Sequence, residues 1–205
     1  MTLNNTEKLI DLILARRSTR SFLPDVPDRQ LMDRLIDCAA AAPNAHNAQP
    51  WRFYILEDRK QRMVLVRKMM ERFAQDLERD KVSRQEIDRR SFGSVETLGK
   101  APVLILACLD MTDMTRYADA PRVEAERIMG IQSVAAAIQN LLLAAWAQGL
   151  GGCWYCAPLF CYDLIQKSLD LPQTHEPQAF ITIGYPDTNA AKPLRKPIDE
   201  IRFRR

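Results

Sequence analysis

The sequence predicts a mixed domain with many helices and few strands, of the α+β or α/β class. Stretches with apolar residues at steps of three and four alternate with short unbroken apolar stretches. The first pattern is typical of amphipathic helices and the second of buried strands. Of 205 residues, 47% are hydrophobic, which is enough for one sizeable core and argues against disorder. Without internal repeats, residues 1–205 are predicted to form a single domain.

The first quarter of the chain predicts two helices, a loop and a strand. Apolar residues within 9–14 lie on one side of a helix that runs into Arg16 and Arg17. After Pro24 and Pro27, Asp28 is suited to cap a helix with apolar positions between 31 and 39. Proline and asparagine make the next segment, APNAHNAQP, a loop. Residues 51–56 (WRFYIL) then form a buried strand.

The middle of the chain predicts a charged helical segment, a strand and a long apolar helix. Residues 57–91 are rich in charge, but their apolar residues recur at helical spacing, so we expect an amphipathic surface helix and a shorter one up to Phe92. A second strand is expected at 102–109 (PVLILACL). A long helix from about 123 to 148 follows, and Gly149 ends it.

The last quarter predicts a short helix, a strand and an arm. GLGGCWYC leads toward a helix over 159–169, and residues 179–185 (AFITIGY) form a strand that Pro186 stops. Residues 186–205 contain Pro193, Pro197 and many charges, so an extended arm is expected there.

Charge and cysteine content predict a cytoplasmic protein that binds neither nucleic acid nor membrane. The net charge is only +3, whereas generic polyanion binders carry a stronger basic surplus. No signal peptide is expected, because the first apolar residues are spaced helically. The apolar stretch 134–150 is short and contains polar residues, which argues against a membrane span. The five cysteines are an odd number without an export signal, so reduced thiols are expected.

Two segments carry groups suited to a ligand. RRSTR places Arg16, Arg17, Ser18 and Arg20 within five residues. Their side chains are hydrogen-bond donors suited to a phosphate or carboxylate. The alternative interpretation is a solvated helix end. APNAHNAQPW offers neutral donors and acceptors that can read a flat polar heterocycle, with simple turn chemistry as the alternative. His46 in this loop is interpreted as an incidental surface histidine.

The cysteines and glycines after the long helix allow several interpretations. Cys153 and Cys156 have CxxC spacing, for which structural thiols are favoured over a redox pair. Only two histidines are present, so no metal site is expected. GLGGCW follows a helix and lacks the spacing of a dinucleotide fingerprint. Since no group of side chains in the sequence indicates a catalytic site, we consider that a bound cofactor supplies the reactivity.

Four segments in this order resemble the nitroreductase family of flavoenzymes. They are RRSTRSF, APNAHNAQPWRFYIL, AAAIQNLLLAAWAQGLGGCW and EPQAFITIGYPD, and the resemblance runs from about residue 15 to 201. The charged helices before APVLILACLD further resemble the reductase domain of two-domain proteins that make the deazaflavin coenzyme, here without the ligase half.

The resemblance implies an α+β fold whose central, mostly antiparallel sheet is flanked by helices. It also implies a homodimer with a domain-swapped C-terminal arm (186–205) and tightly bound FMN in two sites at the dimer interface. Residues 57–95 would be a family-variable helical excursion.

The resemblance also assigns cofactor-binding residues. The phosphate and ribityl chain would be held by Arg16, Arg17, Ser18, Arg20 and Arg195. The partner subunit would supply Pro43, Asn44, Ala45 and Asn47, and the isoalloxazine ring would lie beside Trp154, Tyr155, Cys156 and Ala157. Asn44 stands where many members have Ser, and Cys156 stands where one branch has an acidic residue near the flavin.

The function that the resemblance implies is hydride transfer from NADH or NADPH, through FMN, to a small acceptor such as a nitroarene or quinone. No catalytic protein base is required. One alternative is a dedicated reductase or dehydrogenase of a single metabolite such as a deazaflavin precursor. Others are a flavin-binding protein without turnover and, least favoured, a small basic nucleic-acid binder.

Overall fold

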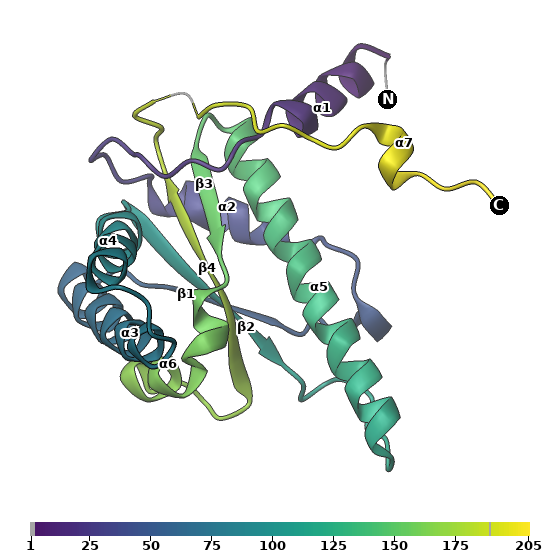
Figure 1. Cartoon of the computed structure of the whole chain (residues 1–205). Helices are drawn as coiled ribbons and strands as arrows, with labels where there is room; N and C mark the ends of the chain where they lie inside the picture. Colours follow the sequence, from purple (N-terminus) through teal and green to yellow (C-terminus); the bar gives the residue numbers. More distant parts are fainter. Residues whose placement is uncertain (1–2, 189) are drawn as a thin grey trace.

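A four-stranded antiparallel sheet with helices on both faces forms the body of the chain in this computed structural model (Figure 1). The structure describes residues 3–188 and 190–205. The predicted domain 1–205 and arm 186–205 therefore include Met1, Thr2 and Asn189, which lie outside the described residues. The mixed helix-and-strand class expected from the sequence is confirmed.

The sheet has the order β1-β2-β4-β3, and each neighbouring pair is antiparallel. Its strands are β1 (Trp51–Ile55), β2 (Val103–Asp110), β3 (Gly151–Tyr155) and β4 (His175–Gly184). Three of them lie where apolar stretches predict them. The sequence does not predict β3, because glycine is depleted in strands and the glycines of GLGG indicate a loop.

The central strand β2 divides the apolar interior into two clusters. Its side chains at 103, 105, 107 and 109 pack with α2 (Arg29–Ala40) and α5 (Ala120–Ala147) on one face. Those at 104, 106 and 108 pack with α3 (Arg59–Arg79) and α6 (Tyr162–Leu169) on the other. Because both faces are covered, all eight residues of β2 are buried, and all but the last, Asp110, form a continuous apolar run rather than an alternating pattern.

Local signals explain where most helices begin and end. The N-cap predicted for α2 is present, since Asp28 Oδ1 accepts a 2.7 Å hydrogen bond from the Leu31 backbone N–H. Asp119 caps α5 in the same way, and Gly149 follows its end in the left-handed region with φ of +76°. The charged segment forms α3, α4 (Arg84–Ser94) and a π-helical turn, η2 (Val95–Gly99). Neither the sequence pattern nor the propensities predicted η2.

Helix α5 is the core helix of the molecule. By length and composition alone it could cross a membrane. Its buried residues, among them Val134, Ile138 and Leu141, instead pack on the sheet as part of the first apolar cluster. The helix runs diagonally past the sheet and ends beside α1 (Leu3–Ala15) (Figure 1).

Both ends of the chain carry apolar side chains in solvent. The arm reaches away from the body and contains one short helix, α7 (Ile198–Ile201) (Figure 1). Leu194 on this arm is 99% exposed and Phe203 is 81% exposed. On α1, four apolar residues are also exposed: Leu9, Ile10, Ile13 and Leu14. Within the described residues, these two apolar surfaces are uncovered.

Candidate functional site

A segment that we term the N-terminal strap (residues 18–23) lies beside the edge strand β3. Ser18 forms a parallel bridge with Gly152, and the Thr19 backbone N–H donates a 3.0 Å hydrogen bond to the Gly152 carbonyl. Further along, the Leu23 backbone N–H donates to the Tyr185 carbonyl at 2.9 Å. The strap therefore holds the residues that follow α1 against β3 and the end of β4.

Gly151 allows this close approach. A Cβ atom at Gly151 would lie 2.5 Å from the Cβ of Thr19, far inside van der Waals contact. Thr19 is itself buried, and its branched side chain is too short to move aside. Gly151 thus serves the packing of the strap, whereas a Cβ at Gly152 would meet Leu142 and Ile183.

The residues after α1 meet the C-terminal arm in a cavity of about 220 Å³, which we term the arginine cavity. It is lined by Arg16, Arg17, Ser18, Arg20, Ala191, Pro193 and Arg195. The structure thus brings together five residues to which the sequence resemblance assigns phosphate and ribityl contacts. Arg195 is 175 positions or more from the other four, so only the folded arm could bring it there.

The charges around this cavity are unbalanced. Burial in the first place, then the charges of Arg195 and Arg17, hold the pKa of the Arg16 guanidinium below its ordinary value. Arg17 Nη1 donates to the carbonyls of Leu14 and Arg16, each at 2.7 Å. Within the described part of the chain, none of the four guanidinium groups forms an ion pair with a carboxylate. This arrangement of guanidinium groups is suited to binding an anion.

The end of β3 lies next to the arginine cavity. Trp154 and Tyr155 point to opposite faces of the sheet, because Trp154 packs with the α5 cluster and Tyr155 with the α3 cluster. Burial first, and then Cys153, raise the pKa of the Tyr155 hydroxyl, whereas Thr97 and Arg20 act in the opposite direction. Because Thr97 and the charge of Arg20 both act on the Tyr155 hydroxyl, Arg20 and the turn η2 lie close to Tyr155. No sequence pattern points to Thr97, which lies on the turn η2.

The two cysteines of the CxxC spacing differ in environment. Cys153 is buried inside β3, whereas Cys156 is exposed and Ala157 begins a short 3-10 helix, η3 (Ala157–Phe160). A thioredoxin-like pair needs its first cysteine exposed at a helix N-terminus. Cys153 therefore lacks the exposure that such a redox pair requires.

The side chain of Asn44 holds the conformation of the amide-rich loop (residues 43–49) through hydrogen bonds to the loop backbone. Asn44 Oδ1 accepts a 2.8 Å hydrogen bond from the Gln49 backbone N–H, and Asn44 Nδ2 donates to the Ala42 carbonyl at 3.3 Å. The Ala45 backbone N–H donates to Ser133 Oγ on α5 at 3.2 Å. Pro43 and Asn47 flank these contacts. Asn44 thus shapes the loop, the role that its turn chemistry predicts.

Three residues of this loop lie in the left-handed region, with φ of 56° for His46, 53° for Asn47 and 48° for Gln49. Such strain persists only where surrounding contacts hold it, and it clusters at functional sites. One such contact is between His46 Nε2 and Oε1 of the buried Glu126, at 3.2 Å. His46 is exposed, as expected for a surface histidine, but a buried carboxylate on α5, far along the chain, holds its ring.

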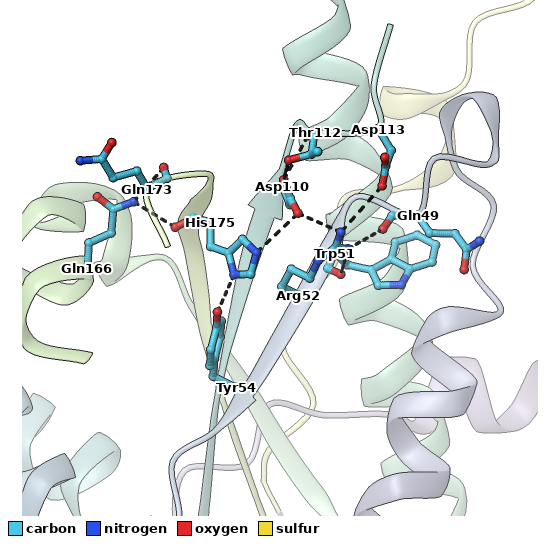
Figure 2. A network of polar contacts seen from close by, with 10 residues as sticks. All are labelled: Gln49, Trp51, Arg52, Tyr54, Asp110, Thr112, Asp113, Gln166, Gln173 and His175. Carbon is cyan, nitrogen blue, oxygen red and sulfur yellow. Dashed lines mark hydrogen bonds and ion pairs between the residues drawn. The ribbon is translucent and has the colours of Figure 1, made fainter. Parts of the chain in front are cut away.

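A polar network anchors the other end of the loop (Figure 2). The carboxylate oxygen Oδ2 of buried Asp110 lies 2.8 Å from Arg52 Nη2 and 3.4 Å from His175 Nε2. The other ring nitrogen of His175, Nδ1, is hydrogen-bonded to the Tyr54 hydroxyl. Arg52 Nη1 also donates to the Gln49 carbonyl at 3.0 Å. The sequence does not predict this network, because its members come from β1, β2 and β4 and meet only through strand pairing.

Asp110 is ionised within this network. Burial alone would raise the pKa of its carboxyl, but the hydrogen bonds from Thr112 and the charges of Arg52 and His175 outweigh burial, and the pKa lies below its ordinary value. A negative charge therefore holds Arg52, and through Arg52 the last carbonyl of the loop.

Within one chain, the amide-rich loop and the arginine cavity lie apart. The loop is beside the middle of α5, whereas α1 and the arm meet near the C-terminal end of that helix (Figure 1). No residue of 43–47 belongs to the wall of the arginine cavity. The predicted residues thus form two groups, one around the arginines and β3 and the other around the loop.

Comparison with known proteins gives a consistent result. The family model described as "Nitroreductase family" matches residues 13–185. A 5,6-dimethylbenzimidazole synthase from Rhodospirillum rubrum is 32% identical over 173 residues, which cover 83% of this chain and 78% of the relative.

Solved structures share the fold. A BluB-like flavoprotein from Clostridium difficile matches with a TM-score of 0.77 and 29% identity, over 95% of this chain and 97% of that one. A Desulfovibrio desulfuricans protein, named as a nitroreductase and solved in complex with FMN, matches with a TM-score of 0.74 and 23% identity over 96% of each chain. The α+β fold with its antiparallel sheet is thereby confirmed. With most of its length matched by the family model, the chain belongs to the nitroreductase family, close to the BluB-type flavoproteins.

Proposed function

We propose that this protein is an FMN-dependent oxidoreductase that passes a hydride from NADH or NADPH to a small organic acceptor such as a nitroarene or a quinone. The arginine cavity is the observation that carries the proposal. Four guanidinium groups surround a small cavity without a carboxylate partner among the described residues, directly beside β3. This arrangement suits a ligand with a phosphate at one end and a planar ring at the other.

In this proposal one chain binds both the phosphate and one side of the ring of FMN. The phosphate lies among Arg16, Arg17, Arg20 and Arg195, where charge-assisted hydrogen bonds hold it and Ser18 adds a hydroxyl donor. The strand residues Trp154 and Tyr155, with Cys156 and Ala157, offer backbone groups alongside the ring. The buried indole N–H of Trp154 has no hydrogen-bond partner among the described residues, so it is available as a further donor.

A homodimer completes the site. Pro43, Asn44, Ala45 and Asn47 reach the ring from the partner subunit, because within one chain their loop lies away from the arginines. The exposed apolar residues of α1 and of the arm support such an interface, since monomers rarely leave large apolar patches in water. We propose that the arm, exchanged between subunits, covers part of this surface.

Bound FMN supplies the hydride chemistry, so no protein base is required. The protein binds the phosphate, orients the ring and leaves room for the donor and then the acceptor. A cytoplasmic location, where nicotinamide donors are abundant, is part of the proposal.

The direct test is an absorbance spectrum of the FMN-loaded protein without oxygen, before and after addition of NADPH or NADH. We expect the visible flavin band to bleach and to return when menadione or a nitroarene is added. A band that persists with both donors would reduce the protein to a flavin binder without turnover. No flavin band after incubation with FMN would overturn the proposal.

An Arg16→Ala substitution is expected to weaken FMN binding about 10- to 100-fold, because hydrogen bonds to a charged group contribute about 1.5–3 kcal/mol each. Quenching of FMN fluorescence during titration measures this loss. Arg67→Ala, at an exposed position on α3, is the matched control and should bind FMN like the unaltered chain. Equal affinity of the two variants would contradict the phosphate assignment.

A second candidate function is the conversion of one dedicated metabolite, which the 32% identity to 5,6-dimethylbenzimidazole synthase favours. A deazaflavin precursor is another substrate of this kind, suggested by the sequence resemblance. Turnover of a single compound, with slow reduction of every quinone and nitroarene offered, would favour this alternative over a general reductase.

A further inference from the structure

A second cavity, larger than the arginine cavity and sharing no residue with it, lies at the other end of the strap. Its volume is about 600 Å³, within the range of small-molecule sites. It lies between the strap and residues 24–27, helix α2, the start of α3 and the start of β2. We term it the strap cavity.

The strap cavity has an apolar part and a cationic part. The apolar wall includes Phe22, Leu23, Val26, Met32, Ile55 and Val103. The charged wall contains Arg29, Arg59, Arg62 and Lys100, against the single carboxylate of Glu57. A ligand that fits both parts has an apolar body and a negative charge.

Two of the four cations are already paired. Arg29 Nη2 lies 2.8 Å from Glu57 Oε1, and Lys100 Nζ lies 2.7 Å from Glu96 Oε2, which is outside the wall. Among the described residues, no carboxylate pairs with Arg59 or Arg62. The cationic part is therefore not neutralised by the protein around it.

Arg62 is the strongest indication of a ligand. Its side chain is buried, with 4% of the residue exposed, and Nη2 donates to the Ala101 carbonyl at 2.7 Å. Its Nε is also buried and has no hydrogen-bond partner within the described part of the chain. Burial first, and then the charge of Arg59, lower the pKa of Arg62. A buried donor left unmatched destabilises the fold unless an acceptor occupies the cavity.

The position of these arginines on α3 adds to the imbalance. Arg59 is the first residue of the helix, and Arg62 follows three positions later on the same side. Cations are unfavourable at a helix N-terminus, where the helix dipole is positive. Asp58 caps this terminus by accepting from the Lys60 and Gln61 backbone N–H groups, but it does not line the cavity.

We propose that the strap cavity binds an amphipathic organic anion, with its carboxylate or phosphate at Arg59 and Arg62 and its apolar body against Met32, Phe22 and Val103. This site is separate from the proposed FMN site and does not depend on it. The two ends of the strap would then each contact a different anionic ligand.

The test uses the chain of residues 1–205 labelled with methyl-¹³C methionine, with octanoate as the probe. Met32 lies in the cavity wall, and its signal is assigned from the Met32→Leu variant. We expect octanoate to shift the Met32 methyl signal saturably, and 1-octanol to bind about tenfold more weakly because it lacks the charge. A Met32 signal that octanoate leaves unmoved would overturn the proposal, as would equal binding of octanoate and 1-octanol.

Substitutions identify the charged contacts. Arg59→Gln and Arg62→Met are each expected to weaken octanoate binding about tenfold, and Arg67→Gln, on the same helix but outside the wall, should leave it unchanged. Arg59 is exposed, so Arg59→Gln decides the matter even if the Arg62 variant fails to fold. If Arg59→Gln binds octanoate like Arg67→Gln, the anion assignment is wrong.

Discussion

An Asp110→Ala variant is expected to lose about 3 kcal/mol of unfolding free energy, because removing one partner of a buried ion pair leaves the other charge uncompensated. Asp110 is buried, and it receives both Arg52 and His175. We expect the lower end of the usual range, since the Arg52 side chain is 35% exposed and water partly replaces its partner. Urea unfolding at neutral pH, followed by circular dichroism, measures the loss.

The same carboxylate makes this loss depend on pH. The pKa of Asp110 is lower in the folded chain than its ordinary value of 3.8, so its ionisation contributes stability above that value. The contribution disappears as the pH falls through the folded pKa. The difference in unfolding free energy between the unaltered chain and Asp110→Asn should therefore be largest at neutral pH and shrink below about pH 4. A constant difference across this range would show that the hydrogen-bond acceptors of the side chain, rather than its charge, are responsible.

A Gly151→Ala variant is expected to lose about 2–3 kcal/mol, because the added Cβ would lie 2.5 Å from Thr19 and force the strap away from β3. For a chain of this size, that loss lowers the melting temperature by about 5–10 °C. FMN affinity should fall as well, since Ser18 and Arg20 move with the strap.

Gly93→Ala is the matched control for this substitution. No atom lies within 4 Å of a Cβ built at Gly93, and the residue is inside α4, where alanine is favoured over glycine. Its melting temperature should stay the same or rise slightly. If the two variants melt alike, Thr19 has moved aside and the strap is not held by close packing.

The sequence predicts elements well where one local signal dominates. Asp28 and Gly149 mark the ends of helices, and the unbroken apolar run of β2 marks a strand buried on both faces. It fails at β3, where Gly151 allows packing against Thr19, more than a hundred residues away. Propensity describes each residue's local preference and cannot include such a contact.

The same distinction applies to the candidate site. The arginines that follow α1 are neighbours in the sequence, so the sequence alone predicts that they cluster. Arg195 joins them only because the arm folds back, and the sequence resemblance, rather than any local pattern, pointed to it. The Asp110 network and the pairing of His46 with Glu126 depend entirely on strand and helix packing. No periodicity in the sequence could have predicted either contact.

The pairing of the strap with β3 sets an order of events during synthesis. Thr19 hydrogen-bonds to Gly152, so the strap has no docking surface until the ribosome has made 133 further residues. At about 5–20 residues per second, that interval is on the order of 10 s. Arg195 is made later still. Arg16, Arg17 and Arg20 therefore stay solvated and undocked until residue 195 has been made, because the arginine cavity needs Arg195 for its wall.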